Sequence, residues 1–254
     1  MRIAAIYDIH GNPSALEAVL HDINKKQVDC IVVGGDVVAG PLPIETLALL
    51  QQITLPTHFI LGNAESDVLM HIMGKEINGL SERANEVARW VARRLSPENQ
   101  QFLSSWVPTV QLKTDEQGHV LFCHGTPYNN SEIFTKLTSN EKLTVIFGNL
   151  SASVVVCGHT HMQFDRSIGK IRIVNAGSVG MPFGKAGADW LLIDKEISFN
   201  HTNYDLNKAS ERIRQSDYPY ADDFAKNNVL NPPSEKKMLE MLTRMETEQT
   251  KKRP

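Results

Sequence analysis

The sequence predicts an α/β protein with a mixed, double sheet system, on three observations. With 41% hydrophobic and 22% charged residues, the 254-residue chain has ordinary globular composition, which excludes a disordered chain. Its first half alternates short apolar runs with amphipathic segments, a pattern typical of strand–helix–strand units around a parallel sheet. Its second half carries short strand-like runs separated by turn residues such as Asp115-Glu116-Gln117-Gly118, which indicates hairpins.

The first half begins with alternating strands and helices. Its three apolar runs, at residues 3–7, 30–33 and 57–61, are predicted strands. Asn12-Pro13-Ser14 is a predicted helix start, because proline is pre-set for the first turn. Leu16, Val19, Leu20 and Ile23 follow at helical spacing. Further helices are predicted at residues 44–52, 81–95 and 96–106.

The second half is predicted to be rich in strands and to end in a helix. The strands are expected at residues 110–112, 119–123, 154–157, 163–167, 171–174 and 190–193. A helix follows Pro232-Pro233-Ser234 and carries one apolar stripe of Met238, Met241, Leu242 and Met245. We expect this stripe to dock on the body rather than to bind a partner. The division is therefore a main domain at residues 1–204 and a helical extension at 205–254, with Lys251-Lys252-Arg253 as a solvated tail.

Charge and hydropathy exclude several classes of protein. The formal net charge of −3 argues against a dedicated nucleic-acid surface, which needs a basic field. Apolar runs stay well short of the roughly eighteen residues of a membrane span. Met1-Arg2 leads directly into a strand-like run, without the pattern of a secretory signal. Cys30, Cys123 and Cys157 each lie in an apolar run, so reduced, buried thiols and a cytoplasmic location are expected.

Polar side chains follow the predicted strands at five points. Loops at the carboxyl ends of strands gather in one crevice of an α/β sheet. The polar residues at these ends are Asp8, His10, Asp36, Asn63, His124, His159 and His161. These oxygen and nitrogen donors suit Mn, Fe, Zn or Co rather than a closed structural zinc site. Seven donors exceed the capacity of one tetrahedral ion but suit two ions that share a carboxylate, an arrangement suited to hydrolysis at phosphorus.

In order and context, these five segments resemble the calcineurin-like metallophosphoesterase superfamily. Asn175-Ala176-Gly177-Ser178-Val179-Gly180 resembles a further signature of its small bacterial and archaeal phosphodiesterase branch. The resemblance implies a two-sheet α/β/β/α sandwich and two divalent ions, with Mn favoured and Fe, Zn, Ni or Co as alternatives. It also implies that Asp36 bridges the ions and acts in catalysis with Asn63 and His124. The implied ligand sets are Asp8, His10 and His161 for one ion, and Asn63, His124 and His159 for the other.

One position departs from the pattern of this family. The family's Asn is usually followed by a His that is taken as the general acid, whereas Asn63 is followed by Ala64. Alanine cannot deliver a proton, so we expect leaving groups that depart without protonation, unless His71 or Glu65 reaches the site. The arginine-bearing motifs of the protein serine/threonine phosphatases are also missing from the sequence.

The resemblance therefore implies a phosphodiesterase for nucleotide-type substrates, such as cyclic nucleotides or dinucleoside polyphosphates. The alternatives are a broad-specificity phosphomonoesterase and a non-catalytic metal-binding scaffold. We expect a small phosphate ester or nucleotide as the partner, and no membrane.

Several other residues allow a structural and a functional interpretation. Asn12 is expected either to cap a helix or to contact the substrate phosphate. Packing is favoured over metal or redox chemistry for Cys123 and Cys157. Core positions are favoured over nucleobase stacking for Tyr128, Phe183 and Trp190. Structural roles are expected for His21, His58, His71, His119 and His201. Solvated positions are expected for Glu65, Asp67, Glu82 and Arg83.

Overall fold

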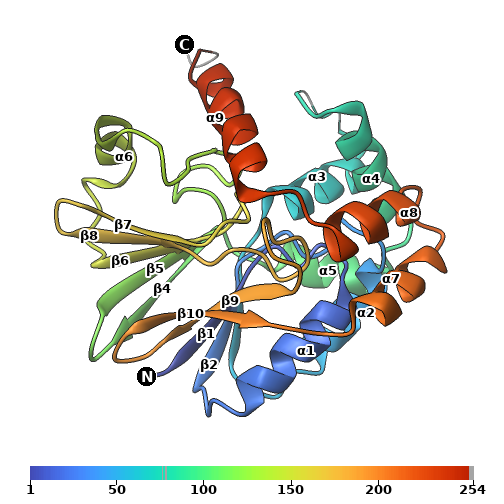
Figure 1. Cartoon of the computed structure of the whole chain (residues 1–254), viewed down its shortest axis with the longest axis horizontal. Coiled ribbons are helices and arrows are strands. Elements are labelled where there is room, and N and C mark those ends of the chain that lie inside the picture. Colours follow the sequence, from blue (N-terminus) through green and yellow to red (C-terminus); the bar gives the residue numbers. More distant parts are fainter. Residues whose placement is uncertain (76, 78, 252–254) are drawn as a thin grey trace.

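Two five-stranded sheets pack against each other, and helices cover their outer faces (Figure 1). The computed structural model describes residues 1–75, 77 and 79–251. The first sheet has the order β10-β9-β1-β2-β3, from strands β10 (Ile197–Thr202), β9 (Ala188–Ile193), β1 (Ile3–Ile6), β2 (Cys30–Val33) and β3 (Thr57–Phe59). The second has the order β4-β5-β6-β8-β7, from strands β4 (Thr109–Thr114), β5 (Gly118–Cys123), β6 (Val154–Cys157), β8 (Ile171–Asn175) and β7 (Phe164–Ile168).

Both sheets are mixed, as the sequence predicts. In the first, β1, β2 and β3 are parallel, and the pair β9 and β10 joins β1 antiparallel. In the second, β5, β6 and β8 are parallel, and β4 and β7 are antiparallel edge strands. The parallel strands of each sheet end at a common edge, because parallel strands share one direction. This edge is where the polar residues of the sequence gather.

Side chains of successive strand residues alternate between two cores. Ile3, Ala5 and Tyr7 enter the core between the sheets, while Ala4 and Ile6 enter the core under the helices of the first sheet. The outer face of the second sheet has its own core, in which β6 packs against helix α6 (Asn140–Phe147). These layers confirm the α/β/β/α sandwich.

Most of the predicted elements are present. The helices of the first sheet's side are α1 (Pro13–Asn24), α2 (Pro43–Gln51), α3 (Asn63–Ile72), α4 (Glu82–Ala92) and α5 (Pro97–Ser104). Helices α3 and α6 and strand β10 were not predicted. Helix α3 begins directly at the candidate ligand Asn63, without the Ser, Thr or Asp cap that marks α4 and α5 in the sequence.

The C-terminal residues form four helical segments, namely α7 (Leu206–Arg214), α8 (Ala221–Phe224), the π-helical turn η1 (Ala225–Leu230) and α9 (Glu235–Lys251). Ala209, Ile213 and Phe224 lie in the same core as β1 and α1. The boundary between residues 204 and 205 stays a prediction. Of the predicted tail, residues 252 and 253 lie outside the described residues.

The predicted docking stripe of α9 is wrong in part. Leu242 is buried against Ile133 and Met162, but Met241 and Met245 are 44% and 42% exposed. The docked face is instead partly polar, because Glu246 accepts hydrogen bonds from Thr138 and Lys142. A stripe chosen by hydrophobicity alone misses polar residues that have buried partners. Figure 1 shows α9 rising from the body beside the region of α3 and α4.

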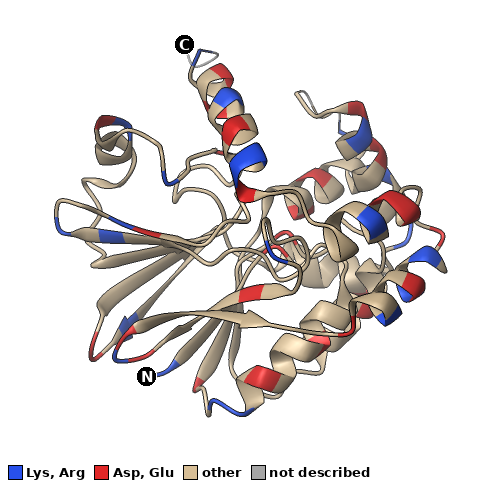
Figure 2. Ribbon diagram, viewed as in Figure 1, with Lys and Arg blue, Asp and Glu red and all other residues tan. Residues whose placement is uncertain are grey.

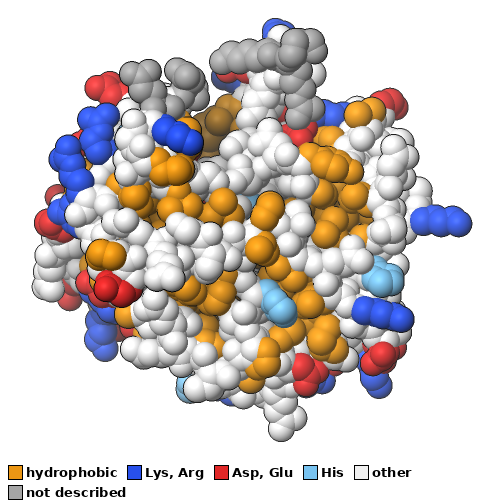
Figure 3. Space-filling view, turned by 180° about the vertical axis from the view of Figure 1, so that it is seen from behind, with side chains coloured by type: hydrophobic (Ala, Val, Ile, Leu, Met, Phe, Trp, Pro, Cys, Tyr) orange, Lys and Arg blue, Asp and Glu red, His pale blue; other side chains and the backbone are white. Residues whose placement is uncertain are grey.

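Charges of both signs are interspersed along α9 and around the other helices, while the strands are mostly uncharged (Figure 2). The opposite face of the molecule shows apolar side chains in several separate patches (Figure 3). The three cysteines are free and buried, as predicted. Among the described residues, none of the helices combines the length and hydropathy of a membrane span.

Candidate metal centre

Six of the seven predicted ligands form two groups of potential metal-binding atoms. One group is Asp8, His10 and His161, and the other is Asp36, His124 and His159. Within each group, the ligand atoms all lie within 4.8 Å of one another. We call these groups the Asp8 triad and the Asp36 triad. The seventh predicted ligand, Asn63, joins the Asp36 triad, because its Oδ1 lies 3.0 Å from His124 Nε2.

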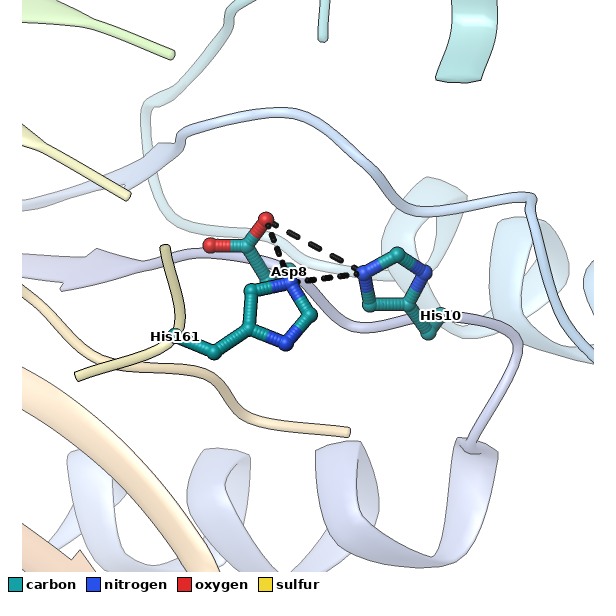
Figure 4. A group of neighbouring side chains, drawn as sticks. All are labelled: Asp8, His10 and His161. Atoms are coloured by element: carbon teal, nitrogen blue, oxygen red, sulfur yellow. Dashed lines mark hydrogen bonds and ion pairs between the residues drawn. The ribbon is translucent and has the colours of Figure 1, made fainter. Parts of the chain in front are cut away.

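The Asp8 triad converges on one point from two segments far apart in sequence (Figure 4). His161 Nε2 lies 3.1 Å from His10 Nε2 and 3.4 Å from Asp8 Oδ1. Asp8 and His10 follow β1, whereas His161 follows β6. The two sheets therefore each contribute a side to this group.

Asp36 belongs to one triad and also faces the other. Its Oδ1 is 3.4 Å from His124 Nε2, and its Oδ2 is 3.9 Å from His10 Nε2. Ala64 N, in the first turn of α3, donates to Oδ1 at 2.8 Å and fixes the carboxylate. A carboxylate with one oxygen toward each group has the geometry of a bridging ligand.

Three of the histidines are oriented by backbone carbonyl groups. His10 Nδ1 donates to Ala39 O at 2.9 Å, His124 Nδ1 to Gly34 O at 2.8 Å, and His161 Nδ1 to Met181 O at 3.0 Å. A carbonyl only accepts, so each Nδ1 carries the proton and each Nε2 points into the site. Metal-binding histidines commonly have this arrangement, which fixes the ring and the tautomer.

The backbone at the site adopts an unusual conformation. Asp8, His10, Asp36, His159 and His161 all have φ between 49° and 65°. Of the described residues, Gln27 is the one other non-glycine residue with positive φ. This conformation costs free energy in a non-glycine residue and clusters at functional sites. The turns after the strands therefore direct these side chains inward at the expense of local stability.

Close packing of backbone around the site requires glycine at two positions. At Gly35, with φ of 92°, a Cβ would lie 2.5 Å from Gly62 N. At Gly158, a Cβ would lie 2.4 Å from Asp8 Oδ2. Only a residue without a side chain allows the backbone to approach this closely at both positions.

Glu65 is a supporting residue whose predicted solvated position is wrong. Its side chain is fully buried, and its carboxylate accepts from the N–H groups of Asp36, Val37, Val38 and Gly62 at 2.7–3.1 Å. It therefore ties the Asp36 loop to the start of α3. Burial and the charge of Asp36 raise the pKa of Glu65 to about 7, whereas the N–H donors favour its carboxylate form. The sequence signal was a Glu in the first turn of a helix, a position typical of capping.

Residues 175–180, which resemble a signature of the small phosphodiesterase branch, also support the site. Ser178 Oγ donates to Asp8 O at 2.7 Å, and Asn175 Nδ2 donates to Gly158 O at 2.7 Å. These contacts join β8 to the two loops that carry the Asp8 triad. Ser178 and Asn175 therefore position the backbone of the loops that carry the ligands, and they are not ligands themselves.

The surroundings give two histidines of the site, His124 and His159, pKa values that differ in opposite directions from the ordinary value. Although burial opposes it, the charges of Asp36 and Asp8 raise the pKa of His124 to about 10. Burial and the charge of His124 lower the pKa of His159 to about 4. His124 Nε2 faces two acceptors, Asn63 Oδ1 and Asp36 Oδ1, which favour the protonated form of His124 in the metal-free protein.

We expect metal binding at the Asp36 triad to release about one proton from His124 near pH 7, because a bound ion needs the Nε2 lone pair. The apparent affinity should rise by up to about tenfold per pH unit between pH 6 and 8, since protons compete with the ion. Calorimetric titration with Mn²⁺ in buffers of different ionisation enthalpy measures this release. Equal heats in all buffers would contradict it.

One unpaired atom tests whether the site fits metal ions. Asp8 Oδ1 is buried, yet it has no hydrogen-bond partner among the described residues. Leaving a buried carboxylate oxygen unpaired is costly unless a cation binds it. Together with the inward Nε2 atoms of the histidines, this oxygen fits a divalent ion at the Asp8 triad, and the Asp36 triad offers a matching set.

The comparisons with known proteins agree with this geometry. The sequence profile of the "Calcineurin-like phosphoesterase superfamily domain" matches residues 1–196. The chain belongs to the calcineurin-like phosphoesterase superfamily. An uncharacterized protein of Methanocaldococcus jannaschii is 30% identical over 239 residues, which cover 85% of this chain and 93% of the relative. Members of this superfamily use divalent metals, and the two triads are where this chain would hold them.

Two solved structures show the same calcineurin-like fold. A hypothetical protein from Pyrococcus horikoshii has a TM-score of 0.78 at 18% identity, covering 92% of this chain and 99% of the other. A metallophosphoesterase from Sphaerobacter thermophilus has a TM-score of 0.68 at 23% identity, covering 90% and 100%. The matches extend beyond residue 196 into the helical extension, since each covers at least 90% of the chain.

Four other residues have both a structural and a functional interpretation in this member of the calcineurin-like superfamily. Asn12 caps α1 by accepting from Ala15 N, and its buried amide donates to Gly180 O and to Tyr204. The capping interpretation is confirmed, and no exposed atom of Asn12 supports a substrate contact. Trp190 is buried as predicted, and Phe183 stacks on His161. The core position predicted for Tyr128 is wrong, because Tyr128 is 70% exposed.

Proposed function

We propose that this protein is a metal-dependent phosphodiesterase that acts on nucleotide-type substrates. The observation that carries the proposal is the pair of triads joined by Asp36, beside a cavity of about 460 Å³ that His10, Asp36 and Asn63 line. Two divalent ions held there would polarise the phosphoryl group and activate a water molecule for attack. The cavity beside them has the size of a small-molecule binding site.

The cavity walls suit an organic group attached to the phosphate. Apolar walls come from α4 and the helical extension, including Val87, Tyr218 and Phe224. The amides of Asn227 and Asn228 add paired donors and acceptors, which suit the polar edge of a nucleobase. His10, Asp36 and Asn63 line the same cavity, so the organic group and the metal ligands are neighbours.

The protein's own groups position the reaction. The carbonyl groups that orient His10, His124 and His161 hold their Nε2 atoms toward the site before substrate arrives. Buried Asp8 and Asp36 provide the negative charge that retains the ions. Prepositioned groups need no rearrangement during reaction, which lowers the barrier.

The two alternatives from the sequence differ in what they need. A non-catalytic scaffold does not need intact ligands, whereas here the side chains of all seven predicted ligands gather at the site. A phosphomonoesterase needs no room for a second organic group on the phosphorus. A panel of phosphate diesters and monoesters therefore separates the two enzymatic functions.

Removal of the metal is expected to abolish hydrolysis. We expect a chelated and dialysed sample to lose activity toward bis(p-nitrophenyl) phosphate, and Mn²⁺ or a related ion to restore it, because the ions supply the charge that stabilises the transition state. Elemental analysis of the same samples gives the metal content. Full turnover in a sample verified as metal-free would overturn the proposal.

A further inference from the structure

An alkoxide or phenoxide leaving group of high pKa needs a proton as it departs from phosphorus. Ala64 lines the cavity beside the metal ligands and has no proton to give. The other acidic side chains near the site are therefore candidates for this role.

The two candidates named from the sequence are both engaged elsewhere. Glu65 is fully buried under four backbone N–H groups. His71 Nε2 is hydrogen-bonded to Asn85 Oδ1 at 2.8 Å, and His71 is not among the residues that line the cavity. Neither side chain is placed to reach a substrate in the cavity.

Asp67, unlike Glu65 and His71, lines the cavity. It lines the cavity together with Asn63 and Ala64, because positions three and four apart share one face of α3. It is half-buried rather than solvated, which corrects the prediction from the sequence. Its carboxyl group makes no hydrogen bond or ion pair with any residue that the structure describes, so it is available to a ligand.

Asp223, another acid that lines the cavity, differs from Asp67 in its partners. It pairs with Arg83 and accepts a hydrogen bond from Asn227. Arg83 keeps the pKa of Asp223 below its ordinary value, so Asp223 stays a carboxylate. A carboxylate fixed by an arginine cannot act as an acid.

We propose that Asp67 is the general acid that protonates the leaving oxygen of the substrate. The proposal rests on the proposed function. In this step, the oxygen of the attacking water bonds to phosphorus while the bond from phosphorus to the leaving oxygen breaks. The bonding pair stays on the leaving oxygen, which takes the proton of Asp67. The attacking water loses one proton to solvent as its oxygen bonds to phosphorus. The Asp67 carboxylate then takes up a proton from solvent, which restores the acid.

The surroundings of Asp67 favour its protonated form. Burial, and secondarily the charge of Asp36, raise the pKa of Asp67 to about 6. Among the residues that the structure describes, the other charged groups that line the same cavity are Asp36, Arg83 and Asp223, together with titratable His10. Ions bound at the Asp36 triad would offset the charge of Asp36, which leaves burial as the main cause.

The test compares leaving groups in the metal-loaded enzyme. For Asp67→Asn, we expect kcat/KM to fall about 10²-fold for ethyl phenyl phosphate but less than about threefold for ethyl p-nitrophenyl phosphate. The difference arises because p-nitrophenoxide departs without a proton, while phenoxide needs one. A structural defect would lower both values alike. The metal content of the variant should equal that of the wild type.

Asp223→Asn is the matched control, since it removes a carboxyl group that lines the cavity and belongs to neither triad. It should leave the ratio of the two kcat/KM values unchanged. The role of Asp67 would be overturned if Asp67→Asn lost kcat/KM equally for both diesters, lost none, or lost its metal.

Such a result would leave the proposed function intact, provided that the wild type hydrolyses both diesters. A metal-loaded wild type that hydrolyses neither diester would overturn both.

Discussion

Asp36→Asn is expected to lower kcat/KM for phosphodiesters by about 10³-fold or more. The two ions together contribute several kcal/mol to the transition state, and each 1.4 kcal/mol corresponds to about a factor of ten. Asp36 faces both triads, with Oδ1 toward His124 and Oδ2 toward His10. Asparagine keeps the oxygen that accepts from Ala64 N but presents a neutral NH₂ group to one of the ions. One substitution therefore weakens both metal sites.

Metal content and activity should be measured on the same samples of this variant. Asp189→Asn is the matched control, because Asp189 is a half-buried carboxylate paired with His201 outside the triads. We expect the control to keep both ions and its activity. An Asp36→Asn protein that binds two ions with wild-type affinity would contradict the bridging role.

The ligands could be predicted from the sequence because they follow buried strands. Runs such as Cys30-Ile31-Val32-Val33 predict a strand, and the rule that parallel strands of one sheet share one edge then brings Asp36 near Asp8. His159 follows β6 of the second sheet, so its place beside Asp36 depends on how the two sheets pack. The mixed, double sheet system was predicted for the same reason, since periodicity and turns indicate where strands pair, whereas the α/β/β/α sandwich followed from the resemblance to the family. What the pattern shows is the order of the elements and the edge at which they end.

The positions of residues that support the ligands or line the cavity could not be predicted in this way. Glu65 and Asp67 both belong to α3 and are separated by one residue, yet one is buried under the Asp36 loop and the other lines the cavity. Their difference depends on the direction in which α3 leaves Asn63, a tertiary property. The exposed Met241 and Met245 show the same limit, because the partners of α9 come from residues 131–142.

Glu65→Ala is expected to destabilise the metal-free protein by about 4 kcal/mol, since a buried donor left without an acceptor costs about 1–3 kcal/mol. Four backbone N–H groups, those of Asp36, Val37, Val38 and Gly62, lose their acceptor in this variant. Glu65→Gln keeps one oxygen and should give an intermediate loss. Because the Asp36 loop is no longer held to α3, we also expect the Asp36 triad to bind metal more weakly.

Denaturant unfolding of the metal-free variants, followed by circular dichroism, measures the loss directly. Glu98→Ala is the matched control, because Glu98 lies in the first turn of α5 but is exposed, so its removal should leave the unfolding midpoint unchanged. The order of midpoints should be wild type, then Glu65→Gln, then Glu65→Ala. Such an order means that the acceptor oxygens themselves hold the loop, because the volume of the side chain changes little from glutamate to glutamine. Equal midpoints for Glu65→Ala and Glu98→Ala would show that the loop keeps its conformation without Glu65.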